Sequence, residues 1–309
     1  MRAGRTAADG TEAPPGKRSR FVAASDAVGW HIFPAQAPAQ EFLASPEGQG
    51  LQLWALETSA TGGRCYIAAS RADFWRRYRT LRPPFRHYYE VICAGQPCHA
   101  YLDVEWCRRA NPGRDDERAM AALREALGSA LRSRYGLEIE RLVELDSSTE
   151  RKFSRHLIVQ LPGAAFADNL HCGRFVHSVC SQLAERAASE PTAARCFVLP
   201  PAAEPACEPA AELSGSTPGA GPSDAPPPAA PSHRVCIVDL AVYTRNRCFR
   251  LFKSSKVGKQ AQLVPAHMSE EELWHLPHAE ERELFMSSLA ANVVPSSESS
   301  LLRFDQADE

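Results

Sequence analysis

The stretch LDSSTERKFSRHLIVQL, residues 145–161, places a turn before an apolar strand that carries polar side chains at its start. Residues 146–149, DSST, are typical of a turn, and the sequence after Lys152 has the composition of a β-strand. Ser154 and His156 are two residues apart, so they share one face of that strand. A hydroxyl, an imidazole and an ammonium on one side favour a polyphosphate ligand. The alternative is a polar edge strand.

A second motif, AYLDVEW at 100–106, alternates apolar and acidic residues in the same way. Asp103 and Glu105 are predicted to lie side by side on one face of a strand. Two adjacent carboxylates repel each other and raise one pKa, and a divalent cation removes that repulsion. The alternative is a solvated strand face.

A third motif, VCIVDLAVYTRNRCFRLFKSSKVGK at 235–259, combines one acid with many cations. Asp239 lies between Val238 and Leu240 and is expected to point away from their face. Seven lysines and arginines occur from Arg234 to Lys259, and Asp239 is the only acid among them. This excess favours a triphosphate or anionic-polymer surface over a merely solvated one. The sequence has no Walker loop and no G-x-S-x-G elbow.

Composition bounds the other possibilities. The chain has 309 residues and a net charge of −2, with no apolar run long enough to span a membrane and no secretory signal. None of its ten cysteines forms a C-x-x-C pair. A candidate zinc cluster at 171–180 (His171, Cys172, His177 and Cys180) coincides with a good amphipathic helix. We therefore favour free thiols there and expect no zinc.

Strands and helices alternate along the chain, which predicts an α/β (α+β) fold. Helices are expected near 36–45, 70–80, 115–136 and 278–290, and around His171. The predicted organisation is a disordered tail at 1–27, a core at 28–197, a disordered Pro/Ala-rich insertion at 198–233, the rest of the core at 234–300 and a tail at 301–309.

Three acids, a Lys/Ser/His cluster and an arginine-rich segment together suggest two-metal phosphoryl transfer. A metal-dependent nuclease would use the same carboxylates. The triphosphate-type cations favour a free nucleotide substrate instead.

The segments YLDVEW, LDSSTERKFSRHLI and VDLAVYTRNRCFRLFKSSKVGK resemble the three active-site motifs of the PrimPol family. These are eukaryotic DNA primase-polymerases of the archaeo-eukaryotic primase superfamily. The resemblance covers residues 50–196 and 235–292. It implies an RRM-like antiparallel sheet that carries the carboxylates and packs with a smaller α/β lobe, with the active site in the cleft between them.

The resemblance also implies a role for each matching residue. The metal-binding catalytic carboxylates would be Asp103, Glu105 and Asp239, which would hold two Mn²⁺ or Mg²⁺ ions. The nucleotide-binding residues would be Lys152, Ser154, His156, Arg250, Lys256 and Tyr89, with Tyr89 near the sugar, where it would disfavour ribonucleotides. The template DNA would contact Arg64 and Arg247.

The chain departs from the family pattern in three places. The family continues into a zinc-binding module and an acidic tail that docks on a single-strand DNA-binding protein, and this sequence ends at Glu309 without either. Cys248 stands where the family has a polar residue, and residues 1–35 match weakly. The sequence is thus a short isoform, a partial gene model or a divergent relative, which leaves de novo priming open.

The leading expectation is a DNA-directed primase/polymerase core that transfers nucleotides from dNTPs to a primer 3′-hydroxyl on a DNA template. The resemblance implies a role in replication restart and damage tolerance, in the nucleus and the mitochondrial matrix. We expect a monomer without membrane contact. The alternative is a catalytically weak truncated isoform that binds single-stranded DNA without priming. The presence of all three acids favours the enzyme, because buried paired acids without a metal cost stability.

Overall fold

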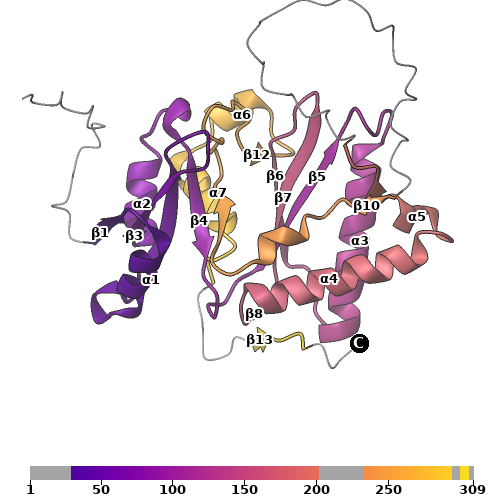
Figure 1. The fold of residues 1–309 in the computed structure, drawn as a ribbon, viewed down its shortest axis with the longest axis horizontal. Coiled ribbons are helices and arrows are strands. Elements are labelled where there is room, and N and C mark those ends of the chain that lie inside the picture. The colour runs from indigo at the N-terminus through magenta and orange to yellow at the C-terminus, as the bar shows by residue number, and fades with distance from the viewer. Residues whose placement is uncertain (1–28, 202–232, 294–299, 306–309) are drawn as a thin grey trace, which may run out of the picture.

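The computed structural model describes residues 29–201, 233–293 and 300–305. Within these ranges the fold is built on two antiparallel sheets with helices packed on them (Figure 1). This mixture of helices and antiparallel sheets confirms the α+β class. The predicted tail at 1–27 and all but the ends of the predicted insertion at 198–233 lie outside the described residues.

The five-stranded sheet contains the N-terminal strands and one late strand. In sheet order, its strands are β1 (Trp30–Phe33), β3 (Arg64–Ala69), β2 (Gln52–Glu57), β4 (Tyr88–Ile92) and β11 (Arg247–Arg250). Alternation along β2 serves both faces: Leu53 and Ala55 pack with α1 (Gln36–Ala44), whereas Trp54 stacks on Phe74 of α2 (Arg71–Tyr78) at 3.8 Å. β11 therefore joins an otherwise N-terminal sheet as its edge strand.

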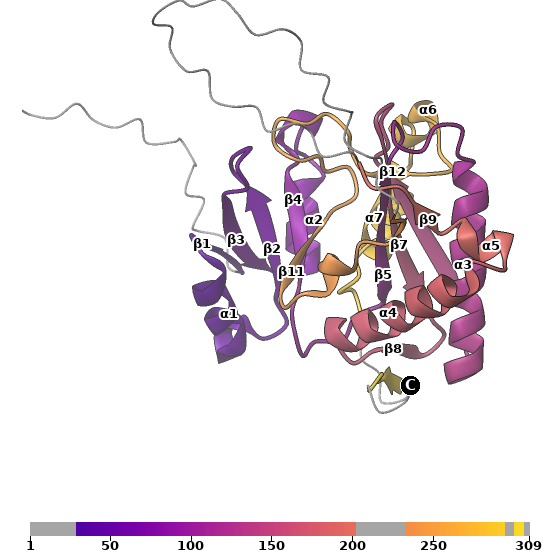
Figure 2. The ribbon, with the colours of Figure 1, turned by 45° about the vertical axis from the view of Figure 1, so that its right-hand side comes forward.

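The four-stranded sheet carries two of the three predicted motifs. Its strands, in sheet order, are β12 (Val264–Pro265), β6 (Arg141–Asp146), β7 (Lys152–Gln160) and β5 (Ala100–Cys107). Two long helices, α3 (Asp116–Tyr135) and α4 (Asn169–Arg186), lie on the side of this sheet away from the five-stranded sheet (Figures 1 and 2). The opposite side is therefore left to face β11.

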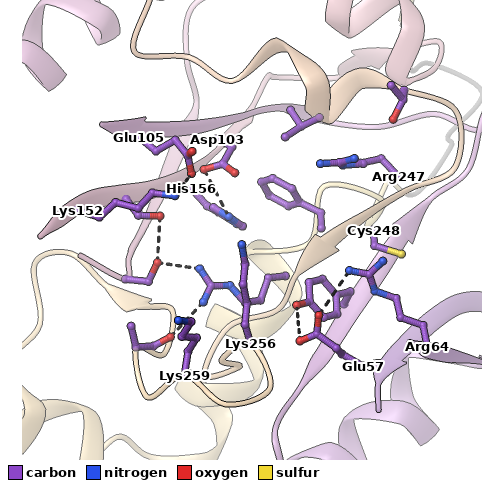
Figure 3. A pocket seen from close by; sticks show the side chains of 18 of the residues that line it. Glu57, Arg64, Asp103, Glu105, Lys152, His156, Arg247, Cys248, Lys256 and Lys259 are labelled. Carbon is purple, nitrogen blue, oxygen red and sulfur yellow. Dashed lines mark hydrogen bonds and ion pairs between the residues drawn. The ribbon is translucent and has the colours of Figure 1, made fainter. Parts of the chain in front are cut away.

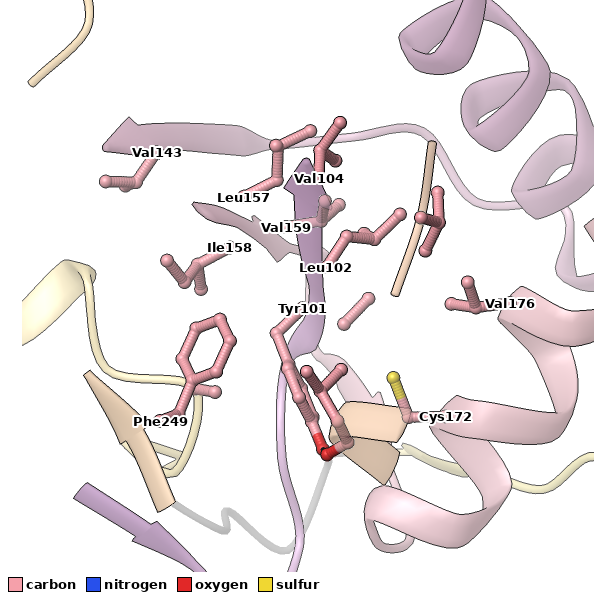
Figure 4. Packing of buried hydrophobic residues seen from close by; sticks show 14 of the residues in the cluster. Tyr101, Leu102, Val104, Val143, Leu157, Ile158, Val159, Cys172, Val176 and Phe249 are labelled. Atoms are coloured by element: carbon pink, nitrogen blue, oxygen red, sulfur yellow. The ribbon is translucent and has the colours of Figure 1, made fainter. Parts of the chain in front are cut away.

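The core is continuous through both sheets. Leu102 and Val104 of β5 and Leu157 and Val159 of β7 are buried beside Val176 of α4 (Figure 4). This apolar set alternates with the polar residues of the same strands, as period-two patterning requires. The alternation thus puts these apolar residues on the helix-covered face and the Asp103, Glu105, Ser154 and His156 side chains on the other face.

The predicted helix ends follow their capping signals. The Ser70 hydroxyl accepts a hydrogen bond from the Asp73 N–H at the start of α2 (3.1 Å), as the capping pattern indicates. Asp115 caps α3, which ends at Gly136 with φ of +67°. The expected C-terminal helix is α7 (His278–Ser287).

The short elements connect the larger ones. They are η1 (Pro46–Gly48), η2 (Pro83–Phe85), η3 (Leu240–Tyr243), α5 (Pro191–Ala194), α6 (Glu270–Trp274), the antiparallel pair β9 (Phe197–Val198) and β10 (Val235–Cys236), and the parallel pair β8 (Ala164–Phe166) and β13 (Ser300–Leu302).

The start of the predicted tail at 301–309 belongs to a strand that the sequence did not predict. β13 pairs with β8, with Leu302 opposite Phe166, and Phe304 is only 4% exposed. The Phe304 ring packs against Phe175 of α4. Leu302 and Phe304 are the buried apolar side chains that hold this segment on the core.

Candidate functional site

The two predicted acidic and polar strands pair directly. In the register of β5 with β7, Asp103 lies opposite His156 and Glu105 lies opposite Ser154. Lys152, at the start of β7, forms an ion pair with Glu105. The two i, i+2 patterns found in the sequence are therefore one polar surface on adjacent strands.

Asp239 reaches this surface from the other edge of β5. Val238 bridges Val104, and the Asp239 N–H donates to the carbonyl of Asp103 at 2.8 Å. The Asp239 side chain also accepts a hydrogen bond from the Ala241 N–H at 2.9 Å, which starts η3. The third motif thus brings its acid next to Asp103, although the two residues are 136 positions apart.

Asp103 lies in an unfavourable electrostatic environment. Its side chain is 18% exposed, and Oδ1 has no hydrogen-bond partner among the described residues. Burial raises the pKa of Asp103 to about 6, with further increases from Glu105 and Asp239, while Lys152 and Arg250 lower it. Among the described residues, no cation or hydrogen-bond donor thus compensates Oδ1 of Asp103 within hydrogen-bond distance.

His156 is held between the sheets. Its ring stacks on Phe249 of β11 with centroids 4.0 Å apart, and its side chain is 5% exposed. Burial lowers its pKa well below the ordinary 6.5, and the nearby Arg250, Lys256 and Lys152 lower it further. His156 is therefore a neutral imidazole at neutral pH.

The cations come from β7, from β11 and from the loop after it. Arg250 donates to the Ser147 hydroxyl at 2.8 Å, and Ser147 in turn donates to Ser154 at 3.2 Å. Lys256 and Lys259 are exposed at the same opening. Figure 3 shows Lys152 beside Glu105, and Lys256 and Lys259 across the opening from the carboxylates. The sequence indicated Ser147 only as a turn residue, and Lys259 was not among the predicted site residues.

The opposite end of the cleft is built by the five-stranded sheet. The Tyr89 hydroxyl donates to Glu57 at 3.1 Å, and the Arg64 guanidinium lies 5.0 Å from the centroid of the Tyr89 ring. Burial raises the pKa of Tyr89 to about 12, so the phenol is protonated. Arg247 and Cys248 line the same opening (Figure 3). Glu57 was not predicted as a site residue. The one indication in the sequence is that an acidic residue ends the otherwise mostly apolar strand LQLWALE at 51–57.

The cleft has a volume of about 780 Å³ and gathers ten of the eleven residues singled out in the sequence. Asp239 is the exception. It lines an adjacent groove that shares Glu105 and Lys152 with the main cleft.

The donor set suits a hard divalent cation, because Asp103, Glu105 and Asp239 supply carboxylate oxygens. The orphaned Oδ1 of Asp103 supports this fit. Among the described residues, however, no three His, Cys, Asp or Glu side chains converge into a ready ligand group. Metal binding would therefore require the three carboxylates to move closer together.

The helix that carries the candidate zinc cluster serves packing in the structure. Cys172 and Cys180 of α4 are buried in the core, and His171 lies against the backbone of Phe304, with its Nδ1 3.1 Å from the Phe304 nitrogen.

No helix within the described ranges is long and apolar enough to cross a membrane.

Comparison with known proteins gives a consistent result. No family model matches the chain. The chain is 34% identical over 274 residues to a DNA-directed primase/polymerase protein of Danio rerio, 36% over 282 residues to that of Mus musculus and 34% over 296 residues to that of Homo sapiens.

Each of these alignments covers 85% of this chain but only 50%, 51% and 52% of the respective relative, so the chain spans about half the length of the curated relatives it matches. The resemblance indicated by the three motifs is thereby confirmed. Over the part that aligns, the chain belongs to the family of the DNA-directed primase/polymerase proteins.

Proposed function

We propose that the chain forms a catalytic core of the archaeo-eukaryotic primase type and adds nucleotides from dNTPs to a primer 3′-hydroxyl on a DNA template. The observation that carries this proposal is the cleft itself. Carboxylates on β5 and cations from β7, β11 and the following loop open onto the same space. The printed names of the relatives support a primase/polymerase function in general.

Asp103, Glu105 and Asp239 would hold the divalent ions. Bound Mg²⁺ or Mn²⁺ would lower the pKa of the attacking hydroxyl and neutralise charge on the leaving pyrophosphate. The Lys152–Glu105 ion pair keeps a phosphate-binding cation and a metal ligand neutralised by each other. When nucleotide and metal bind together, this ion pair would be broken. Lys152 would then contact the phosphate and Glu105 the metal ion.

The triphosphate would lie against Lys152, Arg250 and Lys256. Neutral His156 can donate one N–H to a phosphate oxygen, and the hydroxyl of Ser154 can donate another hydrogen bond. Ser147 already orients Arg250 at 2.8 Å, so this guanidinium is preorganised. The cationic groups thus supply both charge and direction.

Tyr89 would face the sugar of the incoming nucleotide, and Arg64 and Arg247 would contact the template strand. The protonated phenol offers steric bulk without charge, which suits a role in sugar selection. A cellular role in replication restart and damage tolerance, as a monomer in the nucleus and mitochondrial matrix, is part of the same proposal and rests on the family resemblance.

The test uses the purified chain with a labelled primer–template, dNTPs and Mn²⁺, beside the Asp103→Ala/Glu105→Ala variant. A parallel reaction contains template and labelled nucleotide without primer. We expect extension by the unmodified chain and none by the variant, with DNA binding retained in both. Failure of the unmodified chain to extend, with DNA binding intact, would contradict the enzymatic proposal and favour the binding function.

A further inference from the structure

Glu57 is a buried carboxylate in the cleft to which the proposed chemistry assigns no role. It is the last residue of β2, and its side chain is 8% exposed. A carboxylate so far removed from water is unfavourable unless donors or cations compensate it. Its partners therefore indicate what keeps it there.

One oxygen of Glu57 joins two parts of the site. Oε2 accepts hydrogen bonds from the Tyr89 hydroxyl at 3.1 Å and from the Val257 N–H at 2.8 Å. The other oxygen, Oε1, lies 3.7 Å from Arg64, whose guanidinium also lies over the Tyr89 ring. The phenol is thus fixed at its hydroxyl and covered on its face.

The Val257 contact acts on the loop that carries the exposed lysines. Val257 directly follows Lys256 and precedes Lys259 by two residues. The preceding Ser255 is held separately, since its N–H donates to the Arg86 carbonyl at 2.9 Å and its carbonyl lies 3.1 Å from Nδ1 of His87. Within the described residues, the Glu57–Val257 bond is the only hydrogen bond from residues 256–259 to the five-stranded sheet. Loss of the Glu57 bond would therefore free the backbone between the two lysines.

We infer that Glu57 is a positioning residue that holds Tyr89 and the Lys256–Lys259 loop at a fixed separation. It thereby controls both nucleotide affinity and the preference for deoxyribonucleotides over ribonucleotides. The inference rests on the proposed function, in which Tyr89 faces the sugar and Lys256 the triphosphate. Glu57 itself acts through these partners.

Glu57→Ala and Glu57→Gln separate the contacts. Alanine removes both hydrogen bonds and the negative charge. Glutamine retains a carbonyl oxygen where Oε2 accepts its two bonds and replaces the charged oxygen that faces Arg64 with an uncharged NH₂ group. A charged hydrogen bond contributes enough that Glu57→Ala should raise the KM for dNTPs about tenfold or more. Glu57→Gln should restore the KM to within about threefold of the unmodified value.

The preference for deoxyribonucleotides provides the second measurement. The ratio of kcat/KM for dNTP to that for rNTP should fall in Glu57→Ala, because the Tyr89 ring loses its anchor. In a Tyr89→Phe background, which already lacks the hydroxyl, Glu57→Ala should lower this ratio little further. Its effect on the KM should persist there, because the Val257 bond is independent of the phenol.

Glu144→Ala is the matched control for a purely structural effect. Glu144 is a similarly buried carboxylate, 11% exposed, that binds Arg124 and Arg155 on the far side of the four-stranded sheet. Its loss should lower the Tm without changing the KM or the nucleotide preference. If the inference is right, Glu57→Ala changes the KM and the nucleotide preference more than Glu144→Ala does. The two variants are compared at temperatures equally far below their own Tm values.

Equilibrium titration of each folded variant with dTTP and Mn²⁺ gives a readout that does not depend on turnover. Weaker binding by Glu57→Ala, with recovery in Glu57→Gln, would support the inference even if extension proved absent. Unchanged dTTP affinity and unchanged preference in an active enzyme would overturn the role of Glu57 and leave the proposed function standing. If the unmodified chain showed no primer extension, the proposed function would be overturned, and the dTTP titration would still test the role of Glu57.

Discussion

The two faces of the four-stranded sheet use the same strands but satisfy their polar groups very differently. On the helix-covered face, Arg155 donates to Asp146 at 2.9 Å, to Glu144 at 3.4 Å and to Glu117. On the cleft face, Oδ1 of Asp103 and Nδ1 of His156 have no hydrogen-bond partner among the described residues.

This difference distinguishes polar groups that stabilise the fold from polar groups that are left unpaired in the cleft. Buried polar groups are normally paired, so unpaired groups that line a cleft are candidates for contact with a ligand. The Arg155 network stabilises the fold by itself. If the proposed function holds, the cleft face has lower stability in exchange for ligand binding, and each prediction below tests one side of this contrast.

The largest expected effect is on catalysis. Asp103→Asn preserves the shape of the side chain but removes the charge, so we expect primer extension to fall by about a thousandfold or more. The free energy of unfolding at pH 8 should stay within about 0.5 kcal/mol or increase, because a poorly solvated charge is lost. Primer extension and urea unfolding measure the two quantities.

Glu144→Gln, on the other face, is the control for Asp103→Asn. It should lose stability and keep its extension rate per folded molecule. A large loss of stability in Asp103→Asn would contradict the view that this carboxylate serves binding rather than folding.

How much of this contrast can be predicted from the sequence depends on how far apart along the chain the interacting residues are. The alternation in AYLDVEW and in KFSRHLIVQ is local, and it is enough to place Asp103 with Glu105 and Ser154 with His156 on single strand faces. The register that sets Asp103 against His156 is not local. No spacing in the sequence specifies it, because strand pairing is decided by the assembled core.

The far end of the cleft was harder to foresee for the same reason. Glu57 contacts residues 32 and 200 positions away, and its sequence neighbours show only the end of an apolar strand. The C-terminal strand β13 was likewise missed, since a three-residue strand has too little pattern to recognise. The motif resemblance implied a role for Tyr89 near the nucleotide sugar but gave no indication of the contacts that hold its side chain.

The second prediction addresses the paired face. Arg155→Met leaves Glu144, 11% exposed, without one of its cations and breaks three contacts at once. We expect the free energy of unfolding to fall by about 3 kcal/mol. Extension per folded molecule should be unchanged, because the Arg155 side chain points away from the cleft. A loss of activity that exceeds the loss of folded protein would show that the two faces are coupled.

The third prediction uses Glu90, a carboxylate that is buried but fully paired. It is 1% exposed and accepts hydrogen bonds from the N–H groups of Ala290 and Ala291, both at 2.9 Å. Burial nevertheless raises its pKa from the ordinary 4.5 to about 7, although both bonds and Arg71 lower it. Pairing alone therefore does not offset burial at this position.

Because the folded state binds this proton more tightly than the unfolded state, its stabilisation is complete below pH 4.5 and is lost as the pH rises through about 7. The free energy of unfolding should thus be lower at pH 8 than at pH 5, by at most about 3 kcal/mol. Urea unfolding of the unmodified chain and of Glu90→Gln at both pH values measures this. Equal pH dependence in the two proteins would assign the effect to other groups.

The smallest effect is expected for His156, which contributes to both packing and binding. His156→Ala removes one donor to the triphosphate, so the KM for dNTPs should rise by about tenfold, with little change in DNA affinity. It also removes the ring that stacks on Phe249, so some loss of stability is expected. His156→Phe keeps a stacking ring without the donor and separates the two roles. If His156→Phe restored the KM as well as the stability, the imidazole would act through packing, and this part of the cleft face would resemble the helix-covered one.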